Sequence, residues 1–127
     1  MTQVRANRIR AYFEALTAGD VPAILDLFTA DAEVHSPFLG VLPAREFYAR
    51  LDAASANSDL TVLDVLLGED AGTGAARFRY DWTLKSGDRI VFEGVDHFTF
   101  AQDDRFSAMP IYYDTHPVRQ HVGDKYS

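Results

Sequence analysis

The first part of the chain follows a helical pattern of apolar positions. Apolar side chains recur at the spacing of one helix face in three segments: Ile9, Tyr12, Phe13 and Leu16; Val21, Ile24, Leu25 and Phe28; and Ala44, Phe47, Tyr48 and Leu51. Gly19 ends the first segment, and Asp20 followed by Pro22 is a helix-start signal. The pattern predicts three helices, with a brief strand at residues 32–36 between the second and the third.

After Ser58 the pattern changes to the two-residue period of strands. Strands are predicted at residues 60–67, 75–84, 90–101 and 106–113, before a polar tail. The polar residues 85–89 between the two long strands are typical of a hairpin turn. Helices followed by an antiparallel sheet indicate an α+β fold, with the helices packed on one face of a curved sheet. At 127 residues the chain has the size of a single domain, 1–127.

Asp96 interrupts the apolar face of one predicted strand. It shares that face with Phe92, Phe98 and Phe100. A carboxyl group on an apolar face is costly unless it is neutral, paired or hydrogen-bonded. Asp96 is therefore a candidate for chemistry, and the alternative is a structural Asp bonded to a nearby side chain or backbone amide.

The hairpin register decides which residues accompany Asp96. A two-residue turn would place Asp96 on the face of Arg79 and Asp81, and Tyr80 and Trp82 on the opposite face. A three-residue turn or a bulge would reverse this arrangement. With the two-residue turn the outer face would need an apolar cover, which predicts a homodimer through the outer sheet face.

Composition narrows the classes of partner. A net charge of −7 and a pI near 4.9 disfavour nucleic acid and anionic membrane surfaces. There is no Cys, and the four His residues lack the spacing of a metal site, so we expect neither a metal nor another cofactor. No segment has the length and apolarity of a signal peptide or a transmembrane helix, which favours a cytoplasmic location.

Several segments resemble one superfamily. Residues 12–20, 27–34, 45–48 and 95–100 are similar to the NTF2-like fold, which includes ketosteroid isomerase, SnoaL-like polyketide cyclases and limonene epoxide hydrolase. The resemblance runs from about Tyr12 to Tyr113. It implies a cone of three N-terminal helices on a curved, mostly antiparallel sheet that encloses an apolar pocket. The fold hosts many functions, so it does not by itself define an activity.

The resemblance to ketosteroid isomerase implies roles for particular residues. Tyr12 and Asp96 match that family's oxyanion-hole Tyr and protonated Asp, and Tyr48 matches a supporting Tyr. Two donors converging on one oxygen stabilise a developing enolate more than its parent ketone. The expected partner is a small hydrophobic ligand with a carbonyl, enol or phenol oxygen. We expect further ligand contacts from Phe28, Arg79, Phe98, Met109, Ile111 and Tyr113.

The general base of that family has no counterpart here. Its Asp precedes a Pro, and the matching residue is Ser36, before Pro37. Serine does not take up a proton at neutral pH without an activating base. An active enzyme, isomerising a ketone or closing a ring by aldol chemistry, would need Asp81, His35 or Asp96 itself as base, although strand alternation turns His35 to the opposite face.

Two alternatives remain open on the sequence. Arg79-Tyr80-Asp81 is similar to the Arg-x-Asp pair of limonene epoxide hydrolase, which implies a hydrolase in which Arg79, Asp81 and Asp96 position water. Arg79 and Asp81 can equally form a plain ion pair across the sheet. The other alternative is a non-catalytic ligand-binding or accessory domain that keeps the cavity.

Overall fold

The fold combines three helices with one sheet. A computed structural model describes residues 2–116. The helices are α1 (Thr2–Ala18), α2 (Val21–Asp26) and α3 (Ala44–Ala54). The strands are β1 (Phe28–Ser36), β2 (Gly40–Pro43), β3 (Ser55–Leu67), β4 (Thr73–Leu84), β5 (Arg89–Phe100) and β6 (Phe106–Tyr113). α2 begins as expected: Oδ1 of Asp20 accepts a hydrogen bond from the backbone N–H of Ala23 at 3.2 Å, and this caps the helix.

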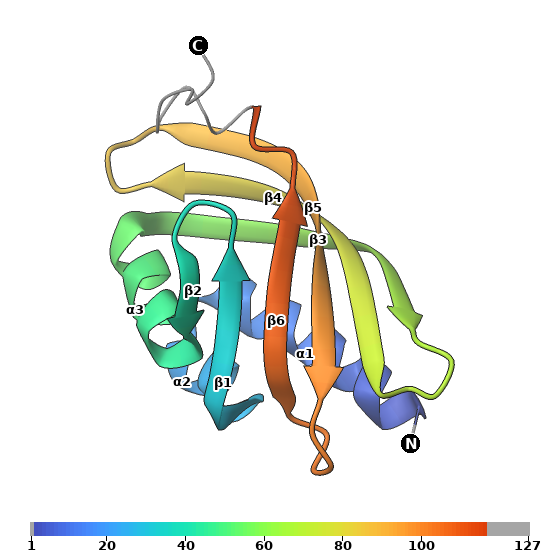
Figure 1. The fold of residues 1–127 in the computed structure, drawn as a ribbon. Coiled ribbons are helices and arrows are strands. Elements are labelled where there is room, and N and C mark those ends of the chain that lie inside the picture. The colour runs from blue at the N-terminus through green and yellow to red at the C-terminus, as the bar shows by residue number, and fades with distance from the viewer. Residues whose placement is uncertain (1, 117–127) are drawn as a thin grey trace.

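The six strands form one curved sheet in the order β2-β1-β6-β5-β4-β3. β1 and β6 are parallel, and every other neighbouring pair is antiparallel. The three helices lie on the same side of this sheet, and α1 runs across it (Figure 1). The predicted α+β fold, with helices on one face of a mostly antiparallel curved sheet, is confirmed. Among the described residues, no helix is long and apolar enough to span a membrane.

The strands differ from the prediction at the edges of the sheet. β2 was not predicted, β3 begins at Ser55, and β1 begins at Phe28, which the helical pattern had assigned to the second helix. Phe28 pairs with Phe106 of β6, and the backbone N–H of Phe106 donates to the carbonyl of Leu27 at 2.8 Å. This pairing joins residues far apart in the chain, so a local periodicity carries no sign of it.

The hairpin between β4 and β5 has the register that a longer turn produces. Leu84 and Asp88 flank a three-residue loop in which Gly87 has φ +94, a left-handed conformation that favours glycine. Ala76 therefore lies opposite Asp96, and Tyr80 lies opposite Phe92. The prediction that Asp96 shares a face with Arg79 and Asp81 is wrong, because it assumed a two-residue turn.

The corrected register moves large aromatic residues to the inside. Phe78, Tyr80 and Trp82 share the concave face with Asp96, while Arg77, Arg79 and Asp81 lie on the outer face. The residues that argued for a covered outer face, Tyr80 and Trp82, thus face the helices instead. The core lies between α1 and the sheet and includes the fully buried Ile9, Phe13 and Phe98.

Candidate active site

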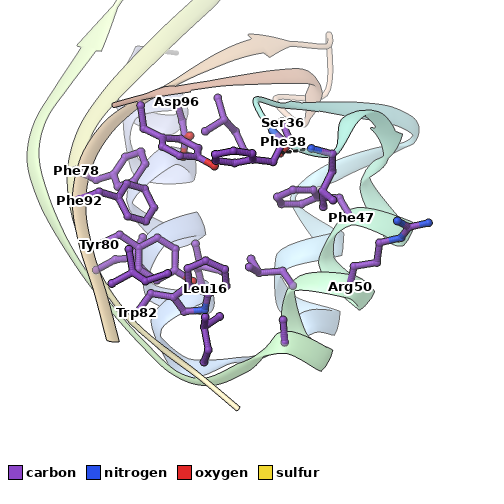
Figure 2. A pocket seen from close by; sticks show the side chains of 18 of the residues that line it. Leu16, Ser36, Phe38, Phe47, Arg50, Phe78, Tyr80, Trp82, Phe92 and Asp96 are labelled. Atoms are coloured by element: carbon purple, nitrogen blue, oxygen red, sulfur yellow. Dashed lines mark hydrogen bonds between the residues drawn. The ribbon is translucent and has the colours of Figure 1, made fainter. Parts of the chain in front are cut away.

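A cavity of about 390 Å³ lies between α1, α3 and the concave face of the sheet. Its walls are largely apolar, and a few polar groups converge on it (Figure 2). The size and lining are those of a small-molecule site. The lining residues used below are Tyr12, Ser36, Phe78, Tyr80, Trp82, Phe92, Asp96, Ile111 and Tyr113.

Asp96 is buried in the cavity wall without a partner. Its exposed fraction is 3%, and it is the buried charged residue of the described part of the chain. Its register neighbours are Ala76 on β4 and Ile111 on β6, and neither side chain can hydrogen-bond. Oδ1 of Asp96 has no hydrogen-bond partner among the described residues. Burial raises the pKa of this carboxyl well above its usual range, which favours its neutral form.

Tyr12 and Tyr48 form a buried hydroxyl pair beside this carboxyl. Their oxygens are 2.6 Å apart, and burial raises the pKa of both phenols well above 10. The charge of an ionised Asp96 would raise the pKa of Tyr12 further, and both residues line the same cavity. Tyr12 lines the cavity, and Tyr48 lies behind it against Sδ of Met109. Tyr48 can donate its one hydroxyl hydrogen either to Sδ of Met109, at 4.0 Å, or to Tyr12. Only if it donates to Tyr12 is the hydroxyl of Tyr12 free to donate into the cavity.

A glycine allows two aromatic residues to pack closely beside Asp96. Gly94 lies on the same face of β5, and a Cβ there would approach Phe78 and Tyr113 to 2.9 Å. The missing side chain lets Phe78 and Tyr113 close in from both sides, next to the carboxyl group. Tyr113 and Ile111 line the cavity as expected, and burial raises the pKa of Tyr113 to about 12.

The other end of the cavity carries residues that the sequence did not single out. The hydroxyl of Tyr80 lies 2.8 Å from Oγ of Ser58, and Nε1 of Trp82 donates to Oγ of Ser55 at 2.8 Å. Burial raises the pKa of Tyr80 to about 12, and the hydroxyl groups of Ser58 and Ser55 partly offset this rise. These residues were missed because the assumed hairpin register put Tyr80 and Trp82 on the outer face. The Lys-Ser-Gly-Asp-Arg turn, with glycine third, was the available signal for the longer loop.

Ser36 occupies the cavity rim where the isomerase family has its base. Its Oγ accepts hydrogen bonds from the backbone N–H groups of Phe38 and Leu39 at 3.3 and 3.2 Å. The neighbouring strand β6 separates it from Asp96, since His35 pairs with Pro110 and Asp96 pairs with Ile111. Ser36 and Asp96 therefore both line the cavity, on strands that β6 separates. Ser36 has a hydroxyl hydrogen to donate.

Three expected site residues lie outside the cavity, which corrects the sequence-based expectation for them. Asp81 is on the outer face and accepts two hydrogen bonds from Arg89, at 2.8 and 2.6 Å, which lower the pKa of its carboxyl. Arg79 is exposed on the same face, opposite Glu93. His35 points away from the cavity, 3.9 Å from Glu33, as strand alternation requires. None of the three can contact a molecule bound in the cavity.

The remaining expected residues form the layer behind the cavity wall. Phe28 and Phe98 hold the ring of Tyr12 edge-on, with ring centroids 6.0 and 5.7 Å away. Met109 is fully buried beside Tyr48. These residues fix the position of the phenol pair but do not line the cavity. Within residues 2–116, no group of His, Asp or Glu side chains is arranged to hold a metal ion.

The fold is that of the SnoaL-like proteins. The SnoaL-like domain family matches residues 9–109, most of the chain, so the protein belongs to this family within the NTF2-like superfamily. No curated protein sequence matches the chain.

Solved structures support the same fold assignment. SalBIII, an "epoxide hydrolase/cyclase-like enzyme" of polyether salinomycin formation, is 22% identical, with a TM-score of 0.81 and coverage of 92% of this chain and 97% of its own. AclR, a "putative hydroxylase" of Streptomyces galilaeus, is 16% identical, with a TM-score of 0.79 and coverage of 97% and 83%. A "putative polyketide cyclase" of Pseudomonas putida is 18% identical, with a TM-score of 0.76 and coverage of 91% and 96%. At these identities the likeness establishes the fold and not the activity.

Proposed function

We propose that this protein binds a small, largely apolar molecule and holds its carbonyl, enol or phenol oxygen between Tyr12 and Asp96. The observation that carries the proposal is the buried Oδ1 of Asp96, which has no protein partner and lies in the wall of an apolar cavity beside a phenol pair. A neutral carboxyl group and a phenol are both hydrogen-bond donors. A ligand oxygen that accepts from both would supply the hydrogen-bond partner that Asp96 lacks in the protein.

The chemistry that this arrangement favours is proton transfer next to a carbonyl group. Two donors stabilise the negative charge that develops on the oxygen as an enolate forms. Among the described lining residues, Asp96 is the one carboxyl group, and no second carboxylate faces it. The site therefore suits a carbon acid that already loses its proton readily, such as a 1,3-dicarbonyl compound, in an isomerisation or an aldol-type ring closure. The polyketide cyclase among the structural neighbours is in line with such a substrate.

A naphthol titration tests the oxygen site. We expect Tyr12→Phe and Asp96→Asn each to weaken the binding of 2-naphthol by about tenfold, the effect of losing or weakening one hydrogen bond. Isothermal titration calorimetry gives the Kd. Naphthalene, which lacks the oxygen, is the matched ligand and should bind the wild type and Tyr12→Phe equally well.

Tyr112→Phe is the matched control variant, because it removes a phenol hydroxyl from the exposed outer face. It should leave the Kd for 2-naphthol unchanged. If Tyr12→Phe and Asp96→Asn both bind 2-naphthol as tightly as the wild type does, Tyr12 and Asp96 do not hold the ligand oxygen.

A second experiment tests the missing base. Ser36→Asp places a carboxylate at the cavity rim, where its oxygens can accept the same two backbone N–H bonds. We expect turnover of a β,γ-unsaturated ketone to rise by roughly 10²- to 10⁴-fold over the wild type, the usual contribution of a general base. The conjugated product is followed by its ultraviolet absorbance.

Ser36→Asn is the neutral control and should show no rise. Adding Tyr12→Phe to Ser36→Asp should remove most of the gain, because the enolate loses a donor. A Ser36→Asp protein that binds the ketone without any gain in turnover would contradict a catalytic geometry and leave a ligand-binding domain.

The hydrolase alternative is not favoured by the geometry. It requires Arg79 and Asp81 to act together with Asp96 on one water molecule. Arg79 and Asp81 lie on the outer face of the sheet, and Asp81 is engaged with Arg89. Asp96 lies on the concave face, so the sheet separates the three residues.

A further inference from the structure

The cavity has a second polar region at the end away from Asp96. Asp96 lies opposite Ala76, and Tyr80 and Trp82 follow four and six residues farther along β4 on the same face. At about 3.3 Å per residue, Tyr80 begins roughly 13 Å from Asp96 along the strand, before the bend of the sheet shortens the distance. Figure 2 shows Asp96 at one end of the cavity and Trp82 at the other, with Phe78 and Phe92 between them.

A continuous aromatic wall joins the two polar regions. The ring of Phe92 lies 4.7 Å from that of Tyr113 and 5.3 Å from that of Tyr80, both tilted by less than 40°. The ring of Tyr80 lies 5.7 Å from that of Trp82. An apolar molecule held at Asp96 and lying along this wall would bring its far end to Tyr80.

The two hydrogen-bonded pairs at the far end differ in the hydrogen-bonding capacity that remains for a ligand. Ser55 donates its hydroxyl hydrogen to the carbonyl of Leu51 at 2.6 Å and accepts from Trp82, so this pair is satisfied. In the pair of Tyr80 and Ser58, either oxygen can be the donor, and one hydroxyl hydrogen remains. If Ser58 donates to Tyr80, the hydroxyl hydrogen of Tyr80 is free to donate to a ligand. If Tyr80 donates to Ser58, a lone pair of Tyr80 is free to accept from a ligand.

Behind this pair the molecule is polar. Ser55 and Ser58 line a separate depression of about 130 Å³, together with Thr17, Asp52 and Asn57. Leu16 and Leu51 line both this depression and the main cavity. The far end of the cavity is thus backed by polar groups, unlike the wall around Asp96.

We propose that Tyr80, supported by Ser58, is a second oxygen-binding subsite, which selects apolar ligands that carry a hydroxyl or carbonyl group opposite the oxygen held by Tyr12 and Asp96. The placement of the first oxygen rests on the proposed function, whereas the subsite rests on the Tyr80–Ser58 pair and its position in the cavity wall. Because the pair can turn, the subsite accepts either a donor or an acceptor. Tyr80 is accordingly a specificity residue.

Two matched pairs of phenols test the subsite. The first is 4-phenylphenol and 4,4′-dihydroxybiphenyl, and the second, longer pair is trans-4-hydroxystilbene and trans-4,4′-dihydroxystilbene. Calorimetry should show that the wild type binds the diol of at least one pair about five- to tenfold more tightly than its mono-ol, the effect of one added hydrogen bond. Tyr80→Phe should abolish this preference and leave the Kd of the mono-ol within about twofold.

The variants separate the subsite from the oxygen site near Asp96. Tyr12→Phe should weaken the mono-ol, as the proposed function requires, and Tyr112→Phe on the outer face should change neither Kd. If Tyr12→Phe leaves the mono-ol unaffected while Tyr80→Phe still removes the diol preference, the proposed function fails and the subsite stands. If neither diol binds more tightly than its mono-ol, or if the preference survives in Tyr80→Phe, the subsite is overturned.

Discussion

At the scale of single residues, the raised pKa of Asp96 follows from neighbours that offer its side chain no hydrogen bond. Ala76 and Ile111 flank it in the sheet, and Gly94 lies on the same face two residues before it. A carboxylate in such surroundings would lose its hydration without gaining hydrogen bonds. Burial therefore favours the protonated form and raises the pKa of the carboxyl group.

This raised pKa predicts how stability changes with pH. The folded chain holds the proton of Asp96 more tightly than the unfolded chain, in which the pKa is near 3.8. The contribution of this group to the free energy of unfolding is thus complete below pH 3.8, and it is lost as pH rises towards the folded pKa. The loss amounts to about 1.4 kcal/mol for each unit between the two pKa values.

Asp96→Asn removes this titration and keeps the shape of the side chain. Urea unfolding of both proteins between pH 4 and pH 8 measures the difference. We expect the stability of the wild type relative to Asp96→Asn to fall as the pH rises from 4 and to level off above the folded pKa of Asp96. A difference that stays constant with pH would mean that Asp96 is ionised in the folded protein or solvated in a way that the cavity does not indicate.

At the scale of elements, the helices were predictable and the sheet edges were not. One apolar face of α1 is formed by Ile9, Tyr12, Phe13 and Leu16, and it packs on the sheet. The spacing of these residues is a local property of the sequence, so it predicts the helix independently of how the strands pair. β2 pairs only over Gly40–Pro43, and the start of β1 depends on β6. A strand's edges are set by its partners, so the local pattern cannot place them.

The prediction of the candidate site depended on the register of one hairpin, between β4 and β5. Asp96 was found from the sequence because a carboxyl group among phenylalanines is conspicuous in any register. Its companions on β4 were misassigned, because one extra loop residue moves every side chain of a strand to the other face. Gly87 in its left-handed conformation makes the three-residue loop, and with it Tyr80 replaces Arg79 as the residue that a ligand can reach.

At the scale of the whole molecule, the outer face of the sheet carries both ion pairs and exposed apolar side chains. Arg77 pairs with Glu93 and Asp81 with Arg89, and beside them Val95 and Tyr112 are exposed. The homodimer expected from the sequence was argued from Tyr80 and Trp82, which face the cavity instead. The dimer therefore stays a prediction, and sedimentation at micromolar concentration decides it.

The half-buried cation of Arg5 holds together the opposite end of the molecule. Arg5 of α1 donates from Nε to Asp104 at 2.8 Å and to the carbonyl groups of Ala71 and Ala101 at 2.6 and 3.3 Å. Its guanidinium lies 4.9 Å from the ring centroid of Phe100. Ala71 and Asp104 both have positive φ, a conformation that costs energy for these residues. Arg5 thus stabilises two strained turns by binding them to the same helix.

Arg5→Ala should therefore lower the free energy of unfolding by about 1–3 kcal/mol, because it removes charge-assisted bonds and leaves partly buried acceptors unpaired. Arg10→Ala, an exposed position on the same helix, is the control and should change it by less than about 0.5 kcal/mol. Arg5 touches no residue of the cavity wall, so the folded Arg5→Ala protein should bind 2-naphthol with the affinity of the wild type. Urea unfolding and calorimetry on the same samples separate the two effects, and a parallel loss of affinity would mean that this end of the sheet shapes the cavity after all.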